Sequence, residues 1–202
     1  MSAPTPVAAS SSLVNRVKAI LMQPKSEWQV IDSEPATVGS IYMGYVVPLA
    51  AIPAVCLALG LMFLGARNAY LGATFGTGWA IKLAIGVYVG YLIDVFVFAL
   101  IIDALAPTFG GQKNQIQALK VAAYSFTAAW VAGIFSLIPF LGILGILGLY
   151  SLYLLYLGLP VLMKAPPDRA MGYTVVSIVA AIVVMVVVRV IINKLTGGYG
   201  YY

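Results

Sequence analysis

Apolar residues dominate five long stretches of this chain, and short polar or glycine-rich gaps separate the stretches. A helix needs about 20 mainly apolar residues to cross the hydrocarbon core of a bilayer, and each stretch is long enough. The pattern predicts an all-α, polytopic membrane protein with one transmembrane domain over residues 41–192. Its five transmembrane helices are expected at about residues 41–64, 79–105, 117–138, 140–163 and 170–192.

The first two predicted spans have irregular features. Pro48 and Pro53 lie inside the first span, and because proline has no backbone donor, we expect this helix to be kinked. The second span is about 40 Å long at the helical rise, so we expect it to tilt or to protrude from the bilayer.

The region before the first span divides into two parts. Residues 1–11 are small and uncharged and include prolines, which predicts disorder. Residues 12–40 are expected to form a cytoplasmic segment that begins with an amphipathic helix at 12–22, with Ser12 as its N-cap. The apolar face of this helix consists of Leu13, Val17, Ile20 and Leu21.

The predicted amphipathic helix is too short and too charged to span the membrane. It can lie in the membrane interface, with Arg16 and Lys18 near anionic headgroups. Alternatively, it packs on the cytoplasmic end of the bundle. The segment after Pro24 is expected to be a short helix or a turn, in which Trp28 is a candidate interfacial anchor. At the other end of the chain, residues 193–202 form a predicted flexible tail.

The composition supports a membrane protein. The chain is 62% hydrophobic and 8% charged, whereas soluble domains are about 45–50% apolar and about 25% charged. The net charge is +5, and the basic residues are scattered along the chain rather than clustered. This distribution is typical of membrane orientation and argues against nucleic acid as a partner.

The positions of lysine and arginine predict which way the helices run. With the N-terminus in the cytoplasm, seven basic residues fall in cytoplasmic segments and four fall in outer segments. Basic residues favour the cytoplasmic side of a membrane. We therefore expect a cytoplasmic N-terminus and, after five crossings, a periplasmic C-terminus.

The residue types that are missing limit the chemistry. The chain has no histidine, one cysteine (Cys56) and six acidic residues. Histidine-dependent triads, thiolate metal cages and internal disulfides therefore lack their parts. We expect no catalytic residue, no metal site and no cofactor.

Asp94 lies near the middle of the second span, where an ionised carboxylate costs on the order of 3 kcal/mol on insertion scales. At the helical rise, Thr127 on the third span and Tyr153 on the fourth lie within about 5 Å of its depth. Either hydroxyl could donate to it. One interpretation is a proton, ion or substrate pathway, and the other is a polar clamp between helices.

Asp103 and Lys120 lie at the cytoplasmic ends of the second and third spans. Their depths agree to within about 3 Å at the helical rise, so we expect a structural salt bridge between them. On the fourth span, Tyr150, Tyr153 and Tyr156 form a slanted stripe. The stripe could line a groove for a headgroup or small molecule, or it could serve interhelical packing.

Small residues occur at regular spacings in two spans. Gly86 and Gly90 form a GxxxG pattern in the second span. Gly142, Gly145 and Gly148 recur at every third position in the fourth. Because small residues let helix backbones approach each other, we expect these five glycines at helix contacts.

Several motifs resemble one family. They are PKSEWQVI (24–31), ALIIDALAPTFGGQKN (99–114), AYSFTAAWVAGIFSLIP (123–139) and GLYSLYLLYLGLPVLMKAPPDRAMGYTVV (148–176). They are similar to bacterial members of the Yip domain family, whose eukaryotic relatives interact with Rab GTPases. The resemblance extends from about Arg16 to about Val190. It implies five spans with a cytosolic N-terminus, and it implies no reaction, ligand or catalytic residue for bacterial members.

We therefore expect a non-enzymatic protein of the bacterial inner membrane that organises lipid or serves as an accessory subunit of a membrane complex. Its expected partners are membrane lipid and, as further candidates, other integral membrane proteins or a second copy of the chain. The alternative is a small transporter or channel that uses Asp94. Inverted repeats would favour transport, but the chain shows no internal repeat and five spans do not divide into equal halves.

Overall fold

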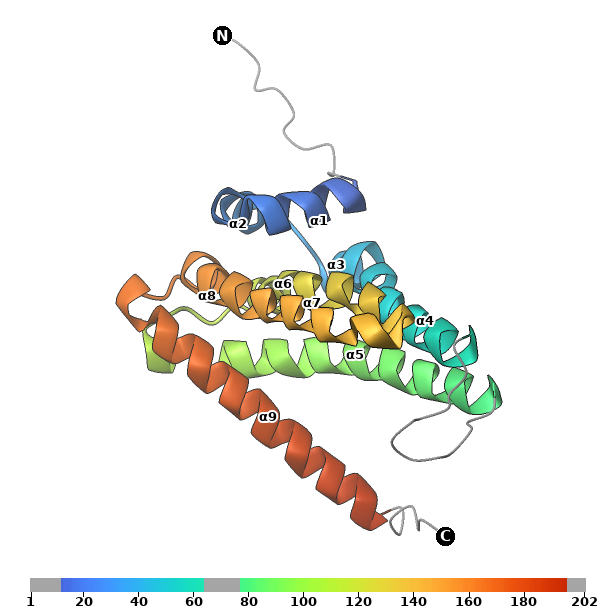
Figure 1. Cartoon of the computed structure of the whole chain (residues 1–202). Coiled ribbons are helices and arrows are strands. Elements are labelled where there is room, and N and C mark those ends of the chain that lie inside the picture. Colours follow the sequence, from blue (N-terminus) through green and yellow to red (C-terminus); the bar gives the residue numbers. More distant parts are fainter. Residues whose placement is uncertain (1–11, 64–76, 196–202) are drawn as a thin grey trace.

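The computed structural model describes residues 12–63 and 77–195 (Figure 1). Within these ranges the chain is helical and contains no strand. The predicted disordered segment 1–11, most of the loop after the first span and the end of the C-terminal tail lie outside the described residues.

Two short helices, α1 (Leu13–Met22) and α2 (Pro24–Ser33), form what we call the N-terminal hairpin. The Ser12 hydroxyl accepts a hydrogen bond from a backbone N–H in the first turn of α1 and is the predicted N-cap. Pro24 is the first residue of α2, where its missing N–H has no intrahelical partner to lose. The segment after Pro24 is therefore a helix rather than a turn.

Five helical segments of the described chain are long and apolar enough to cross a membrane, which confirms the predicted number of spans. The first comprises α3 (Val38–Ile41), the π-helical segment η1 (Tyr42–Val46) and α4 (Val47–Phe63). The π-helical segment ends just before Pro48, whose ring does not fit a regular α-helical turn. The helix widens before this proline and continues through Pro53.

The second span is the longest. It consists of α5 (Thr77–Leu105) and the 3-10 turn η2 (Ala106–Phe109). It ends at Gly110, whose φ of 75° lies in the left-handed region that glycine adopts without strain.

The third and fourth spans are interrupted helices. The third consists of α6 (Gln115–Ser125), α7 (Thr127–Ala132) and the 3-10 segment η3 (Gly133–Leu137). The fourth consists of the 3-10 segment η4 (Pro139–Leu149) and α8 (Tyr150–Leu162). Hydropathy alone predicted where these spans lie, but it carried no sign of the break at Phe126 or of the long 3-10 segment.

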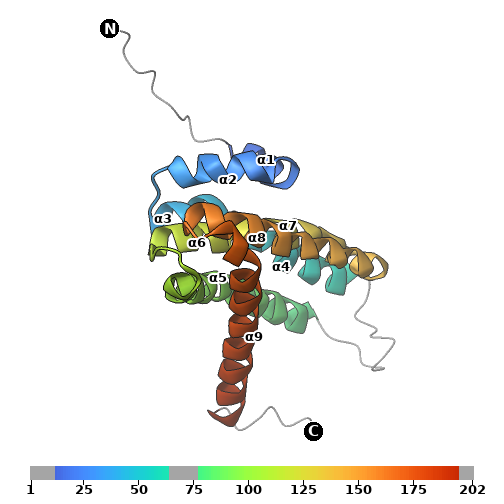
Figure 2. The same ribbon diagram turned by 90° about the vertical axis from the view of Figure 1, so that its left-hand side faces the viewer.

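The last span follows the 3-10 turn η5 (Pro167–Arg169) and is the helix α9 (Ala170–Leu195). Figures 1 and 2 show that α9 crosses the bundle obliquely and that its C-terminal half runs away from the other helices. Within the bundle, α9 contacts the helices α5 and α8.

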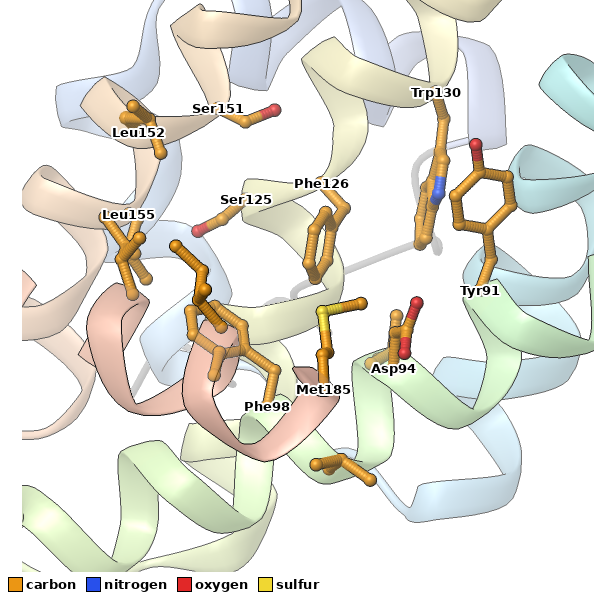
Figure 3. Close-up of a pocket in the computed structure, with 15 residues that line it drawn as sticks. Tyr91, Asp94, Phe98, Ser125, Phe126, Trp130, Ser151, Leu152, Leu155 and Met185 are labelled. Carbon is orange, nitrogen blue, oxygen red and sulfur yellow. The ribbon is translucent and has the colours of Figure 1, made fainter. Parts of the chain in front are cut away.

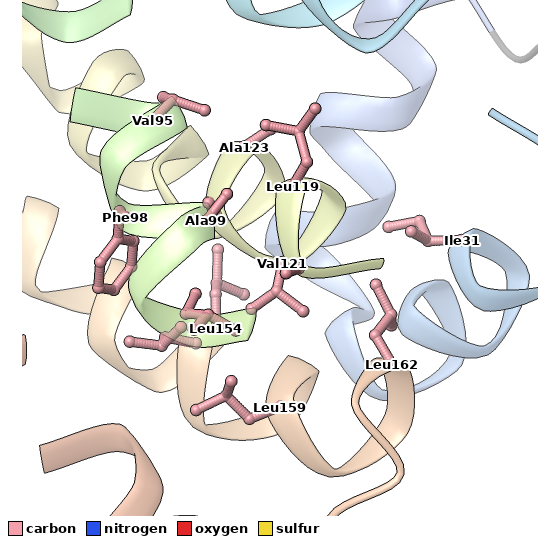
Figure 4. Packing of buried hydrophobic residues seen from close by; sticks show 14 of the residues in the cluster. Ile31, Val95, Phe98, Ala99, Leu119, Val121, Ala123, Leu154, Leu159 and Leu162 are labelled. Carbon is pink, nitrogen blue, oxygen red and sulfur yellow. The ribbon is translucent and has the colours of Figure 1, made fainter. Parts of the chain in front are cut away.

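The helices are arranged in layers. The N-terminal hairpin lies over one side of the bundle, α6, α7 and α8 lie below it, and α5 lies on the far side (Figures 1 and 2). Buried side chains connect these layers, among them Ile31 of the hairpin, Leu119 of α6 and Leu162 of α8 (Figure 4). The hairpin is thus part of the packed core.

Candidate functional site

A cavity of about 300 Å³ lies where α9 diverges from the bundle, between α5, α6, α7, α8 and α9 (Figure 3). Its walls are almost entirely apolar. The polar or amphipathic side chains that line it are Tyr91, Asp94, Ser125, Trp130 and Ser151. An apolar cleft with a few polar groups is the usual form of a site for a small molecule.

Asp94 lies near the middle of its span and lines the cavity. Its side chain is half-buried, and it makes no hydrogen bond or ion pair with the described side chains or backbone. Figure 3 shows its carboxylate between Tyr91 and Met185, below Trp130. The carboxylate is therefore available to a partner from outside this part of the chain.

The two donors expected for Asp94 are engaged or directed elsewhere. The Thr127 hydroxyl donates to the Tyr124 carbonyl at 2.6 Å, so it accepts from the Tyr45 hydroxyl, which lies 2.6 Å away. Tyr153 is 40% exposed and its ring packs beside Tyr150, with 5.4 Å between ring centroids. The predicted clamp through Thr127 or Tyr153 is absent, because equal depth along two helices does not make side chains face each other.

Two further polar atoms of the cavity wall have no partner. Ser125 Oγ and Trp130 Nε1 are buried and make no hydrogen bond. By contrast, Ser151 Oγ accepts from the backbone N–H of Ala129 at 3.0 Å and so supports the third span just after its break. Buried polar atoms without partners are uncommon in native proteins and need an explanation.

A row of aromatic rings stiffens the cavity wall. Phe126 lies between Phe98 and Trp130, with centroid distances of 5.7 Å and 5.8 Å. These rings come from α5, from the break in the third span and from α7. The interruption at Phe126 thus places two aromatic rings and the Ser125 hydroxyl on one cavity wall.

A second polar cluster lies within the N-terminal hairpin and where the hairpin meets α6. Arg16 of α1 is buried and pairs with Glu27 and with Glu34, the latter at 2.5 Å. Burial alone would lower the pKa of Arg16, but the hydrogen bond and charge of Glu34 and the charge of Glu27 raise this pKa above its ordinary value. The guanidinium stays charged and holds α1 against α2.

Lys120 of α6 joins the hairpin to the bundle. Its ammonium donates to the backbone carbonyls of Ile31 at 2.8 Å and Glu34 at 2.6 Å, at the C-terminal end of α2. These free carbonyls and the helix dipole favour a cation at this position. The expected Asp103–Lys120 salt bridge is therefore wrong, and Asp103 Oδ1 is buried without a hydrogen-bond partner.

Further polar contacts attach the edge of the N-terminal hairpin to the bundle. Lys164, in the loop after the fourth span, pairs with Asp32 at 2.5 Å, and Gln117 donates to the other oxygen of Asp32 at 3.0 Å. The Tyr150 hydroxyl donates to the Leu21 carbonyl at 3.2 Å. Within the tyrosine stripe, Tyr150 therefore contributes to packing between the hairpin and the fourth span. None of the three tyrosine rings lines the cavity.

The glycines that mark close helix contacts are mostly not the predicted ones. A Cβ on Gly86, Gly90 or Gly145 would meet nothing within 4 Å, so these positions do not contact another helix of the described chain. A Cβ on Gly148 would lie 3.3 Å from Ala129 Cα, so this glycine does contact another helix. Gly142 lies outside the residues whose side-chain surroundings the structure describes. The closest approaches occur at Gly60, Gly133 and Gly158, and at Gly111 in the loop after the second span.

Two of these missed glycines connect distant elements. Gly133 faces the Pro53 ring of α4, and Gly158 faces the Trp28 ring of the hairpin. The Trp28 ring is fully buried, so it is a core residue rather than the exposed interfacial anchor that its type suggested. Neither glycine belongs to a repeated spacing, so the sequence pattern contained no signal for them.

The described residues contain no group of three potential metal-binding side chains. The polar atoms of the cavity are one carboxylate, hydroxyls and an indole N–H, a set that can bind and orient a molecule. The arrangement thus has the properties of a binding site.

Comparison with known proteins agrees with a membrane protein. The Yip1 domain matches residues 18–188. Inner membrane protein YohC of Escherichia coli strain K12 is 26% identical over 194 residues, which cover 93% of this chain and 98% of the relative. The protein of the same name from Escherichia coli O6:H1 shows the same identity and coverage. No solved structure matches the chain.

Proposed function

The chain belongs to the Yip1 domain family, and from that premise we propose that it acts in the bilayer by binding rather than by catalysis, taking up a small hydrophobic molecule between its helices. The observation that carries this proposal is the mid-span cavity between α5, α6, α7, α8 and α9, with its apolar walls and few polar groups. Clefts between bundle helices are common positions for such sites.

The position of the cavity supports entry from the bilayer. It lies where α9 leaves the bundle, and α9 has many exposed apolar side chains, such as Val179, Ile182 and Val183. These side chains suit contact with lipid tails. A molecule dissolved in the bilayer can therefore reach the cavity without crossing water.

We place the protein in the bacterial inner membrane, as the name of its Escherichia coli relatives supports. The proposed orientation has the N-terminus in the cytoplasm and the C-terminus in the periplasm, in line with the bias of basic residues. Its proposed role is to organise lipid or to serve as an accessory subunit, with membrane lipid, other integral proteins or a second copy as partners. The proposal involves neither cofactor nor nucleic acid.

Filling the cavity tests the proposal. Purified protein in neutral-detergent micelles is expected to bind radiolabelled 1-dodecanol saturably, with about one molecule per chain. Ala181→Phe places a ring in the cavity wall and is expected to lower the affinity about tenfold or more. Val183→Phe, on the exposed side of the same helix, should bind like wild type. The proposal fails if wild type shows no saturable binding or if both variants behave alike.

A small transporter is the second candidate, and the unpartnered mid-span Asp94 favours it. In proteoliposomes, Asp94→Asn would then abolish ion or proton flux while the fold is kept. Wild-type vesicles that show no flux above empty vesicles would rule this candidate out.

A further inference from the structure

We infer that the molecule bound in the cavity is a compact hydrophobic monocation, and that Asp94 balances its charge. This inference rests on the proposed binding function and adds the chemical class of the ligand. It starts from an imbalance: a carboxylate faces an apolar cavity in the middle of a membrane span, and the described chain supplies no counter-charge to it.

The basic side chains with ion pairs or hydrogen bonds in the described chain make them away from the cavity. Arg16, Lys120 and Lys164 all hold the N-terminal hairpin, through carboxylates or backbone carbonyls. No lysine or arginine is among the described residues that line the cavity. A carboxylate in an apolar site is stabilised by an opposite charge, so a cationic ligand supplies what the wall lacks.

The groups around the carboxylate also suit a cation. Tyr91 and Trp130 line the cavity on one side of Asp94, and the faces of aromatic rings attract cations. Contact with Phe126 holds the Trp130 ring in place. The polarisable sulfur of Met185 lies on the other side of the carboxylate (Figure 3).

Two buried polar atoms of the cavity wall make no hydrogen bond within the described chain. Ser125 Oγ, on a residue that is 3% exposed, can accept a hydrogen bond from an ammonium group. Trp130 Nε1 is a donor and can serve a polar substituent of the ligand. These atoms give the site a means of binding a polar group in addition to its apolar walls.

The ligand is a single-headed cation rather than a phospholipid. A phospholipid with an amine headgroup would bring its phosphate beside Asp94, and like charges at this depth repel each other. The cavity volume of about 300 Å³ also suits a small ligand better than two acyl chains. An alkylammonium ion with one apolar tail fits both the charge and the shape.

The test compares two probes with the same tail. Radiolabelled dodecylammonium and 1-dodecanol are titrated into purified protein in neutral-detergent micelles at neutral pH, with protein-free micelles as background. Wild type is expected to bind the cation about tenfold more tightly than the alcohol, or better. Asp94→Asn should lose this preference and bind the alcohol as before, and Asp94→Glu should keep part of the preference.

Matched controls make the result specific. Asp103→Asn removes a carboxylate from the same helix but lies outside the cavity lining, so it should bind like wild type. Circular dichroism checks that each variant is folded. Dioleoylphosphatidylethanolamine added as a competitor should not displace the cation, and displacement by it would contradict the inference in favour of a lipid headgroup.

The outcomes separate this inference from the proposed function. If both probes bind equally well and Asp94→Asn changes neither, the cavity binds hydrophobic molecules without charge selection and the inference fails alone. If neither probe binds saturably, the proposed function fails as well. If Arg189→Gln raises the affinity for the cation severalfold, Asp94 has a counter-charge within the chain and the inference is wrong.

Discussion

Arg16 shows how a charged residue can belong to the buried face of a helix. It lies three residues after Leu13 and four before Ile20, so all three share the face of α1 that packs on the bundle. The sequence interpretation placed its charge near lipid headgroups. Its partners Glu27 and Glu34 come from α2 and its C-cap, and a pattern confined to one helix cannot reveal them.

Asp94 is the opposite case. Its unusual position was evident from sequence, since a carboxylate in an apolar span stands out by itself. Its surroundings were not evident, because the expected donors Thr127 and Tyr153 point elsewhere. Depth along a helix follows from residue number, but the direction of a side chain depends on how each helix is rotated in the bundle.

Glycine substitutions test the packing at single positions. Gly133→Ala would push a methyl group into the Pro53 ring, and we expect a loss of about 1–3 kcal/mol in the free energy of unfolding. Gly145→Ala meets open space, so we expect a change within about 0.5 kcal/mol. Unfolding in mixed micelles with increasing denaturing detergent measures both. Equal effects at the two positions would contradict the contact at Gly133.

At the scale of elements, the N-terminal hairpin differs most from its sequence interpretation. Its helices lie where the apolar periodicity placed them, and their apolar residues pack against α7 and α8. Lys18 and Lys25 are on the exposed side. The described contacts correspond to the alternative of a helix packed on the bundle, whereas an interfacial position of the hairpin stays a prediction.

The hairpin is expected to detach when its central ring is removed. Trp28→Ala deletes a fully buried indole, and such truncations cost about 3–5 kcal/mol. We expect faster cleavage by trypsin at Lys18 and Lys25, because proteolysis follows local opening. Val30→Ala, at an exposed position of the same helix, is the control and should be cleaved like wild type. Unchanged cleavage of Trp28→Ala would show that the polar contacts alone hold the hairpin.

The fourth span illustrates how one spacing can have two causes. Gly142, Gly145 and Gly148 were interpreted as contacts of an α-helix. The structure places them in η4, and because a 3-10 helix has three residues per turn, they line up along one edge of that helix. Of the two whose surroundings the structure describes, Gly148 makes a close contact and Gly145 does not.

At the scale of the whole molecule, five spans imply that the two ends of the chain lie on opposite sides of the membrane. The test starts from Cys56→Ala, which leaves the chain without cysteine, and adds Ser2→Cys or Tyr202→Cys. With a membrane-impermeant maleimide on intact cells, we expect labelling of Tyr202→Cys only. Ser2→Cys should react after the inner membrane is opened. Labelling of both or neither in intact cells would require an even number of crossings.

The whole molecule also explains why the third span is the least apolar of the five. It is central and mostly buried among α1, α3, α4, α5 and α8, and it bonds to the end of α2 through Lys120, so protein rather than lipid surrounds it. A span enclosed in this way can carry Lys120, Ser125 and Thr127, because neighbouring helices supply partners or a cavity for them. Its mean hydropathy is therefore the lowest of the five spans because it lies at the centre of the bundle.

By itself the sequence determined that the chain is a membrane protein, how many times it crosses and which residues are out of place in lipid. These properties depend on local composition, because each span must meet the bilayer on its own. Only the tertiary structure decided which polar groups pair, which glycines contact, and that Asp94, Ser125 and Trp130 share one cavity. These depend on helix rotation, breaks and crossing directions, which arise from contacts between segments far apart in the chain.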